Sequence, residues 1–456
     1  MGDRRRGSEV TKKLAQFVHD LCISDMSEQV ISHTARVIRD TLGTMLAGAA
    51  RPEVRGLAEK ANALGGPGRS TLMGRRETTT PHFAALVNGT GAVSLELDEG
   101  NQYAINHPAV HIFPAALALA EELKRSGAEL LTAFVAGYEV AVRVGRATHL
   151  REAVHPFGTH AIIGTAAAAS RLLRLDIEEI VQALNLAAGI CIASSQTAAN
   201  AGASVRNLAT GLTNHNGLLA PILVRAGFTG EPGSFNVVFG QILGDSFKEK
   251  GLGDDLGQEF YITRNYFKLR ACSRWNHAPI EAMARLLSRK PFKPEDVERI
   301  TVWTYDPATR LSWSNPVNGY AGKHSIPYNV AVRLVLGHND LEAYSEAAVS
   351  NPQVQEISRR VTVREDPKLT AMLPDVRPAR VQVKLKNGSK LTETVERPPG
   401  GFDNPYTEED LLKKFRRLAG MTLTERAVPD LEKTIERLPD LDDVTRLSSL
   451  LQGEGL

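Results

Sequence analysis

The sequence has few cysteines, and this shortage excludes two classes of protein. Its 456 residues contain Cys22, Cys191 and Cys272, which are too far apart to form a CxxC pair. We therefore expect neither a disulfide framework nor a cysteine-ligated cluster. Inert thiols are typical of a reducing compartment, so we predict a cytoplasmic protein.

The chain also has no large net charge and no apolar run long enough to span a membrane. The formal net charge is only +2 and aromatic residues make up 6% of the chain, so no general attraction to nucleic acid is expected. The apolar run over residues 158–169 is too short to span a bilayer and contains His160. The first residues have three arginines and no apolar core, so we expect no secretory signal peptide. We predict neither a nucleic-acid partner nor a membrane partner.

The familiar motifs of cofactor and metal sites are absent as well. The chain has no GxxxxGKS/T phosphate loop, no GxGxxG after a predicted strand, no HExxH zinc motif and no GxSxG nucleophile turn. We therefore expect no cofactor and no metal. The chemistry would then depend on side chains alone.

Helical periodicity dominates the first part of the chain. Apolar residues recur with a spacing of three or four over residues 26–50, and alanine and leucine fill residues 114–124. Asp176 and Glu179 form a capping box before another helix, and residues 214–226 predict one more. A chain of this length is too long for one core, so we expect two domains.

Strand patterns appear in the second half. Residues 297–305 and 358–363 alternate and are rich in Val, Ile and Thr, while Asn387-Gly388 between apolar runs predicts a hairpin. Helical character returns at Thr407, which we expect to cap a helix. We predict a mainly α fold with an α+β second domain. The predicted parts are a large all-helical domain formed by residues 1–266 and 398–456, and a smaller α+β lid domain, residues 267–397, inserted between them.

Several short segments contain side chains that suit a small anion. The pairs His107-Pro108 and His155-Pro156 each precede a predicted helix, where the dipole and free N–H groups favour negative charge. An acidic turn begins at Glu96, before the first pair. Taken singly, each segment also fits an ordinary structural role, such as a solvated acidic turn or an incidental histidine.

Other segments supply cations. Arg206 ends a loop of small residues and can clamp a carboxylate with two hydrogen bonds, although a surface arginine is the plainer alternative. Residues 268–277, at the suspected domain joint, contain three cations and a histidine, and His324-Ser325 opens a further helix. Because pockets form preferentially between domains, these segments together predict a cationic pocket and an anion-binding enzyme.

In this order the segments resemble the MmgE/PrpD family. The resemblance covers about residues 10 to 400, and the motifs that carry it are the acidic turn with His107-Pro108, His155-Pro156 before an alanine-rich helix, Gly-Phe-Thr-Gly at residues 227–230, the basic segment from Lys268, and His324-Ser325 ahead of Tyr328. It implies a helical domain plus a smaller α+β domain, a homodimer, a site between domains and no metal requirement.

The resemblance also implies an activity. Family members include 2-methylcitrate dehydratase, cis-aconitate decarboxylase and an iminodisuccinate epimerase. Our leading hypothesis is a metal-independent lyase that dehydrates a 2-methylcitrate-like hydroxy-tricarboxylate by abstracting a proton α to a carboxylate. An epimerase or decarboxylase of a small polycarboxylate, and a non-catalytic carboxylate-binding protein, are the alternatives. The candidate residues are His107, His155, Lys268 and Tyr328 as catalytic groups, and Glu96, Arg206, Arg274 and His277 as substrate-binding groups.

The expected roles follow the chemistry of these groups. Arg206 and Lys268 would face substrate carboxylates, and Glu96 would orient a histidine. His107 and His155 are the candidates for general acid and base, with their individual roles left open. Arg206 stands where many family members have lysine, and arginine cannot act as a base at neutral pH. Gly100 replaces a common threonine and Ala109 a usual glycine, which leaves the exact substrate open.

Overall fold

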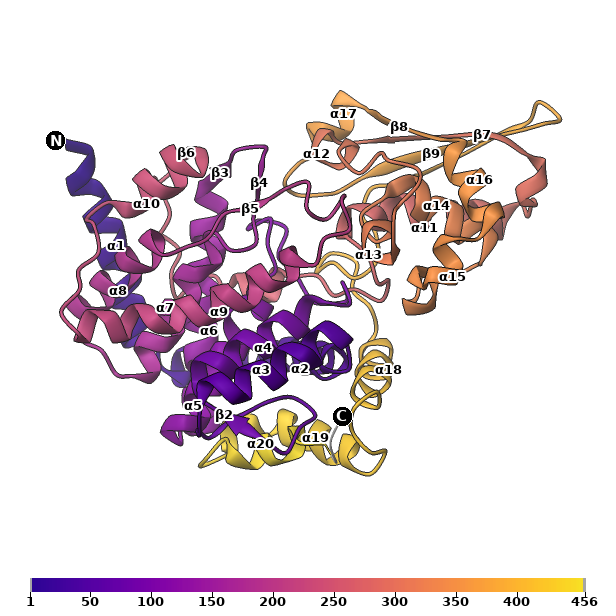
Figure 1. Cartoon of the computed structure of the whole chain (residues 1–456). Coiled ribbons are helices and arrows are strands. Elements are labelled where there is room, and N and C mark those ends of the chain that lie inside the picture. The colour runs from indigo at the N-terminus through magenta and orange to yellow at the C-terminus, as the bar shows by residue number, and fades with distance from the viewer. Residues whose placement is uncertain (1, 454–456) are drawn as a thin grey trace.

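Two large hydrophobic cores organise the chain, one among helices and one around a sheet. Figure 1 shows the helical part and the part that contains the sheet. The computed structural model describes residues 2–453, with side chains from Glu9 onward. The first core uses residues 14–267 and again 411–451, so the chain leaves the helical part and later returns to it. The second core is built mainly from residues 271–395. The predicted fold class, mainly helical with a smaller α+β part, is confirmed, whereas the domain limits stay a prediction because packing does not define where a domain is cut.

Long, closely packed helices form the larger part. Helices α6 and α7 cross where Gly137 faces Gly164, and a Cβ at either position would lie 2.4 Å from the other residue's carbonyl oxygen. The backbones can approach this closely only because both residues are glycine. The helices are α1 (Gly2–Asp20), α2 (Glu28–Ala49), α3 (Pro52–Gly65), α4 (Pro81–Val93), α5 (Pro108–Leu123), α6 (Gly127–Ala147), α7 (Ala161–Leu172), α8 (Ile177–Gly189), α9 (Val205–Arg225) and α10 (Ser234–Val237).

Short strand pairs connect these helices. All three pairs are antiparallel, and two of them lie in the connections around α7 to α10. The pairs are β1 (Ser70–Thr71) with β2 (Thr78–Thr79), β3 (Thr148–Leu150) with β6 (Gly244–Phe247), and β4 (Val154–His155) with β5 (Ser194–Ser195).

A four-stranded sheet with helices on one side forms the smaller part, at the upper right of Figure 1. Its order is β10-β9-β7-β8, with β7 and β8 parallel and the other neighbours antiparallel. Residues of β9 are alternately buried, as expected of a strand with one covered face. The strands are β7 (Val297–Thr304), β8 (Val361–Glu365), β9 (Ala379–Leu385) and β10 (Lys390–Val395); the helices are α11 (His277–Arg289), α12 (Asp306–Thr309), α13 (Gly319–Gly322), α14 (Ile326–Val335), α15 (Glu346–Val349), α16 (Pro352–Arg359) and α17 (Pro367–Thr370).

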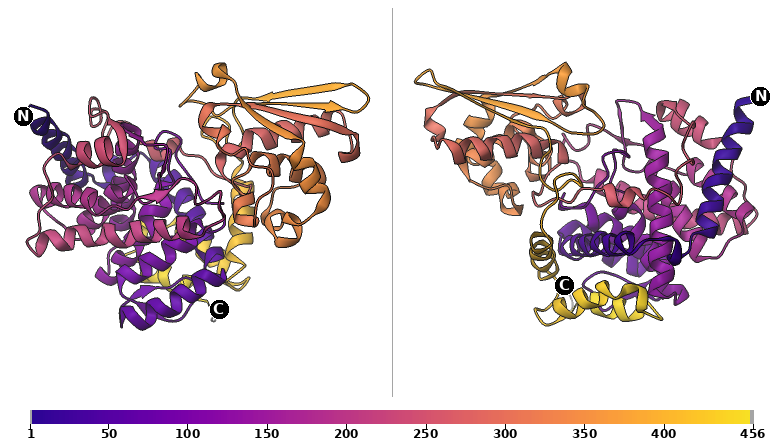
Figure 2. Two further views of the ribbon diagram at one scale, coloured as in Figure 1. Left: turned by 45° about the horizontal axis from the view of Figure 1, so that its top comes forward. Right: turned by 180° about the vertical axis from the view of Figure 1, so that it is seen from behind.

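The C-terminal helices return to the helical part, and Figure 1 and the right-hand view of Figure 2 show the last of them along its lower side. They are α18 (Glu408–Ala419), α19 (Ala427–Glu436) and α20 (Thr445–Leu451). Helix α18 packs on α2, where the Nζ of Lys414 donates to Asp40 at 2.5 Å. Two distant stretches of sequence thus share one core. None of the described helices is long and apolar enough to cross a bilayer.

Most local predictions are confirmed. Asp176 and Thr407 cap α8 and α18 through capping boxes, and the strands β9 and β10 flank the turn at Asn387-Gly388. The prediction of a helix over residues 26–50 corresponds to α2, with Ser27 as its N-cap. These features are set by short-range hydrogen bonds and turn chemistry, which a sequence displays directly.

Three local expectations were wrong. Residues 358–363 are not one strand, because α16 continues to Arg359 and β8 begins at Val361. The expected loop up to Arg206 ends at Ser204, and Arg206 lies in the first turn of α9. Helix α5 begins at Pro108 rather than Pro114, which lies within it. In each case tertiary packing extends a helix beyond what local propensity indicates.

Candidate active site

A cavity of about 460 Å³ is lined by residues from both cores. Five of the eight predicted site residues line it: Glu96, His107, His155, Arg206 and Arg274. Lys268 is fully buried directly behind this wall, whereas His277 and Tyr328 do not line the cavity. The structure thus brings most of the predicted residues to one place, although they come from widely separated parts of the chain.

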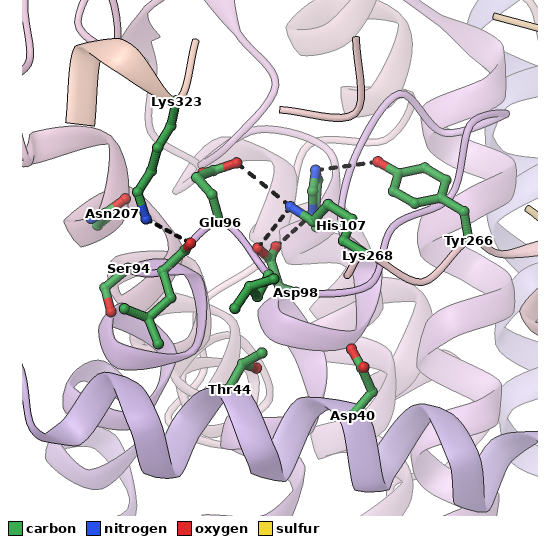
Figure 3. Close-up of polar contacts among 12 residues, drawn as sticks. Asp40, Thr44, Ser94, Glu96, Asp98, His107, Asn207, Tyr266, Lys268 and Lys323 are labelled. Carbon is green, nitrogen blue, oxygen red and sulfur yellow. Dashed lines mark hydrogen bonds and ion pairs between the residues drawn. The ribbon is translucent and has the colours of Figure 1, made fainter. Parts of the chain in front are cut away.

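His107 is held by a buried carboxylate. It is the N-cap residue of α5, where Pro108 keeps it outside the helix interior. Its Nδ1 lies 2.5 Å from an Oδ2 of Asp98, and its Nε2 lies 3.4 Å from the hydroxyl of Tyr266 (Figure 3). A carboxylate at Nδ1 fixes the proton on that nitrogen, so the lone pair of Nε2 faces Tyr266. Burial lowers the pKa of His107, an effect that Asp98 only partly opposes.

Lys268 keeps the Asp98 carboxylate behind His107 ionised. Its Nζ lies 3.2 Å from Asp98 Oδ1 and 3.6 Å from Glu96 Oε2, between the two acids in Figure 3. Burial disfavours the charged form of Asp98, but Lys268 and then His107 lower its pKa below the ordinary value. Arg206 forms an ion pair with Glu96. Two buried cations therefore face two buried anions, and this side of the cavity has no surplus charge.

Two further lysines hold the acidic turn in shape. Glu96 has a φ of 56°, in the left-handed region that a non-glycine residue rarely adopts. Lys323 Nζ donates to the carbonyl of Leu95 at 2.7 Å, and Lys414 Nζ donates to the carbonyl of Leu97 at 2.6 Å. The carbonyls on both sides of Glu96 are thus fixed by lysine amino groups from two other parts of the chain.

His155 has the opposite hydrogen-bond arrangement. It lies in β4, which pairs with β5, and its Nδ1 accepts a hydrogen bond from the N–H of Phe157 at 3.1 Å. Because Nδ1 is an acceptor, the proton of the neutral ring is on Nε2. Burial, with smaller contributions from His107 and His111, lowers the pKa of His155 to about 3. His155 is therefore a neutral hydrogen-bond donor at ordinary pH.

Phe157 contacts His107, His155 and Arg206 and lies between them. The sequence analysis did not identify it. The rings of His107 and His155 lie 5.2 Å and 4.8 Å from its centroid, both edge-on. The guanidinium of Arg206 stacks on its face at 3.9 Å. The only sequence signal was its place directly after His155-Pro156.

Asp98 and Tyr266 were also missed, and two predicted roles differ from the structure. Asp98, not Glu96, is the acid that orients a histidine at hydrogen-bond distance. The hydroxyl of Tyr328 donates to the carbonyl of Ala343 at 2.6 Å inside the second core, so the structure does not bring it to the site. Asp98 is one of three acids in four positions, and only geometry separates them.

Arg274 and His277 form the joint beside the cavity. The guanidinium of Arg274 lies 4.9 Å above the ring of Tyr266 and donates to the carbonyls of Pro398 and Pro399. Its Nη1 also lies 3.2 Å from Nδ1 of His277, which is fully buried behind it. Burial first, and then Arg274, place the pKa of His277 well below its ordinary value. His277 therefore supports Arg274 rather than facing the cavity.

One group of potential metal ligands exists among the described residues. His338, Asp340 and Glu342 place ligand atoms within 4.8 Å of one another. The two acids already lie 3.8 Å and 2.7 Å from Arg417, and none of the three lines the cavity. This group is separate from the candidate active site.

The chain is similar to known proteins along nearly its whole length. The family model of the MmgE/PrpD N-terminal domain matches residues 12–242, and that of the MmgE/PrpD C-terminal domain matches residues 271–439. The cis-aconitate decarboxylase of Aspergillus terreus is 26% identical over 98% of this chain and 97% of its own length. The cis-aconitate decarboxylase of Homo sapiens is 26% identical over 97% and 95%. The 2-methylcitrate dehydratase of Salmonella typhi is 23% identical over 60% of both chains.

Proposed function

The chain belongs to the MmgE/PrpD family, and we propose that it is a lyase that moves a proton at a carbon next to a carboxylate of a small tricarboxylate. The observation that supports this function best is the pair of neutral imidazoles on one cavity, whose Nδ1 atoms lie against a carboxylate in His107 and against a backbone N–H in His155. His107 offers a lone pair, and His155 offers an N–H. Acid–base chemistry next to a carboxylate requires both kinds of group.

His107 is the proton carrier in this proposal. Its Nε2 takes the proton from the carbon α to a carboxylate, and the resulting imidazolium is stabilised by Asp98 at Nδ1. In a dehydration, the C–O bond then breaks and the leaving hydroxyl takes the same proton from His107, which releases water and restores the neutral ring. Lys268 supports this step because it keeps Asp98 ionised.

His155 stabilises the charge that develops on the substrate. A neutral imidazole is too weak an acid to give up its proton, but its Nε2–H can donate to a carboxylate oxygen as negative charge builds there. A protonated His155 would bind more strongly to the ground-state carboxylate. The lowered pKa prevents this and leaves a donor whose interaction is strengthened in the transition state.

Dehydration of a 2-methylcitrate-like hydroxy acid is the reaction that this geometry supports best. The lowered pKa of His107 leaves its ring neutral at rest, and a neutral ring can accept the α proton. Decarboxylation of a cis-aconitate-like acid is the second candidate, because decarboxylases match this chain over nearly its full length. In that reaction the C–CO2 bond breaks, the double bond shifts, and His107 must deliver a proton to the carbanion beside a remaining carboxylate.

A substrate panel tests the proposal. The chain would be incubated in D2O with 2-methylcitrate, citrate, cis-aconitate and iminodisuccinate, and the products followed by mass and by deuterium exchange. Loss of water supports dehydration, and loss of CO2 supports the second candidate. Exchange without loss of mass would indicate an epimerase, and binding without exchange or product would overturn the enzyme proposal in favour of a carboxylate-binding protein.

A further inference from the structure

The charges that line the cavity are unevenly distributed. Near His107, the cations Arg206 and Lys268 offset Glu96 and Asp98. On the wall that belongs to the sheet part, Arg274 and Arg377 are only 6% and 8% exposed. Among the described side chains, no carboxylate lies within ion-pair distance of either guanidinium, since their partners are backbone carbonyls and His277. Two buried positive charges are therefore left without an anion.

Arg377 is fixed in place but incompletely paired. It lies just before β9, and its Nη2 donates to the carbonyl of Gln102 at 2.8 Å. The amide of Gln102 in turn donates to the carbonyl of Asp375 at 2.8 Å, which ties this loop to the acidic turn. The Nε of Arg377 and the hydroxyl of Tyr305 are both buried on this wall without a well-aligned hydrogen bond, although the two side chains lie close enough to interact. Buried donors without acceptors are costly, and an anion would satisfy them.

Tyr266 sets the position of this wall relative to the proton-transfer atom. Its hydroxyl lies 3.4 Å from Nε2 of His107, and the guanidinium of Arg274 lies 4.9 Å from its ring centroid. The Tyr266 side chain thus separates His107 from Arg274, the nearer of the two unpaired cations. The other arginines of the cavity do not share this property: Arg310 and Arg151 are more exposed and lie 3.5 Å and 3.7 Å from Glu152 and Asp245.

We propose that Arg377, together with Arg274, forms an anion subsite that holds a substrate carboxylate remote from the carbon whose proton moves. The inference deepens the proposed function and rests on it. After the reacting carbon and its own carboxylate are placed near His107 and His155, a tricarboxylate still has a remote carboxylate for this wall, whereas a monocarboxylate has none. The subsite therefore selects acids that have a second, remote carboxylate, and Arg377 is a specificity-determining residue.

Equilibrium binding tests the subsite without turnover. The probe is tricarballylate, which has no hydroxyl group or double bond, and its comparator is butyrate, which has a single carboxylate and none to place on this wall. We expect the wild-type chain to bind tricarballylate more tightly by calorimetry. Arg377→Met should weaken that binding by about 10- to 100-fold, because a charge-assisted hydrogen bond is lost. The preference over butyrate should shrink, and Arg377→Lys should recover part of the loss because it keeps the charge.

Two controls separate charge from structure. Arg310→Met removes a paired arginine from the same cavity and should bind tricarballylate like the wild type. Gln102→Ala loosens the loop that holds Arg377 but keeps the guanidinium, so it should weaken binding less than Arg377→Met. Equal losses in Gln102→Ala and Arg377→Met, or wild-type binding in folded Arg377→Met, would overturn the subsite and leave the proposed function standing. If the wild type binds no tricarballylate, the subsite and the proposed tricarboxylate chemistry both fail.

Discussion

His107 and His155 each precede a proline, and each ring lies edge-on to Phe157, yet the fold gives them different tasks. His107 begins a long helix and receives a carboxylate at Nδ1. His155 lies in a two-residue strand and receives a backbone N–H at Nδ1. The same dipeptide therefore presents a lone pair in one case and an N–H in the other.

The comparison indicates that the group that contacts Nδ1 of each imidazole decides what Nε2 can do. Asp98 stabilises a positive charge on His107, so this ring can accept a proton and return it. No such partner exists for His155 among the described residues, and burial opposes its charged form. The histidine roles that the sequence left open are thus proposed from the hydrogen bonds.

Replacing His107 should have the largest effect. Of the two imidazoles, only His107 is proposed to accept and return the proton. His107→Gln removes this base, so kcat/KM should fall by about 100- to 10,000-fold. His149→Gln is the matched control, since His149 is an exposed histidine of the same cavity and should keep wild-type activity. Steady-state kinetics on the substrate found in the panel would measure both, and more than half of wild-type activity in His107→Gln would reject its role.

Replacing His155 should have a smaller effect that depends on the new side chain. His155→Ala removes one hydrogen bond to a developing charge, worth about 1.5–3 kcal/mol, or about 10- to 150-fold in kcat/KM. His155→Gln keeps an N–H donor and should recover part of that loss, although the same substitution at position 107 should not. If glutamine is as damaging as alanine at position 155, donation by the N–H is not its contribution, and the contrast between the two histidines fails.

The pH profile should distinguish the two candidate reactions. Burial lowers the pKa of His107 below its ordinary value of 6.5. If the ring starts neutral, as dehydration requires, kcat/KM should rise with pH through this lowered pKa and stay level at neutral pH. Decarboxylation needs the protonated ring, so its kcat/KM should instead fall through the same pKa.

Asp98→Asn checks the assignment of that titration. Asp98 raises the pKa of His107, so its loss should move the inflection to lower pH as well as reduce the rate. A profile of kcat/KM from about pH 4 to 9 for the wild type and Asp98→Asn would show the shift. An inflection that does not move would mean that another group titrates.

Much of the fold could be predicted because its determinants are local. The capping boxes at Asp176 and Thr407 and the hairpin at Asn387-Gly388 are visible as short residue patterns. The ends of α9 and α16 were less accessible, because they depend on packing between distant segments. The ordered His-Pro and basic segments led to the correct family, and five of their residues line one cavity.

The site could be predicted only in part, because its chemistry depends on contacts between distant residues. Tyr266 meets His107 across 159 positions of sequence, and Arg377 meets Gln102 across 275. Neither tyrosine nor arginine stands out locally in a sequence. Tyr328 was chosen from the motif alone, but its hydroxyl is satisfied by a backbone carbonyl in the second core.

The acidic turn shows that the same limit applies to single residues. The neighbours Asp98 and Glu99 differ in protonation state, because Asp98 is ionised and Glu99 is neutral. Both are fully buried, but Asp98 has Lys268 and His107 beside it. Glu99 instead accepts a hydrogen bond from the hydroxyl of Tyr138 at 2.7 Å, and its charged neighbours are the acids Asp40 and Asp98. Burial raises the pKa of Glu99 to about 8, so its side chain is neutral at pH 7. The sequence shows only three acids in four positions.

This difference should appear as a small, pH-dependent change in stability. The folded chain binds a proton at Glu99 that the unfolded chain has lost above its ordinary pKa of 4.5, so the contribution of Glu99 to stability falls as pH rises from 4.5 to about 8. Glu99→Gln has the shape of the protonated acid and no titration. The free energy of unfolding of Glu99→Gln, measured with urea, should match that of the wild type near pH 4.5 and exceed it near about pH 8. Exposed Glu425→Gln should show no such pH-dependent gain. A difference between Glu99→Gln and wild type that stays constant with pH would mean that Glu99 is ionised in the folded chain, and that Asp98 and Glu99 do not differ in charge.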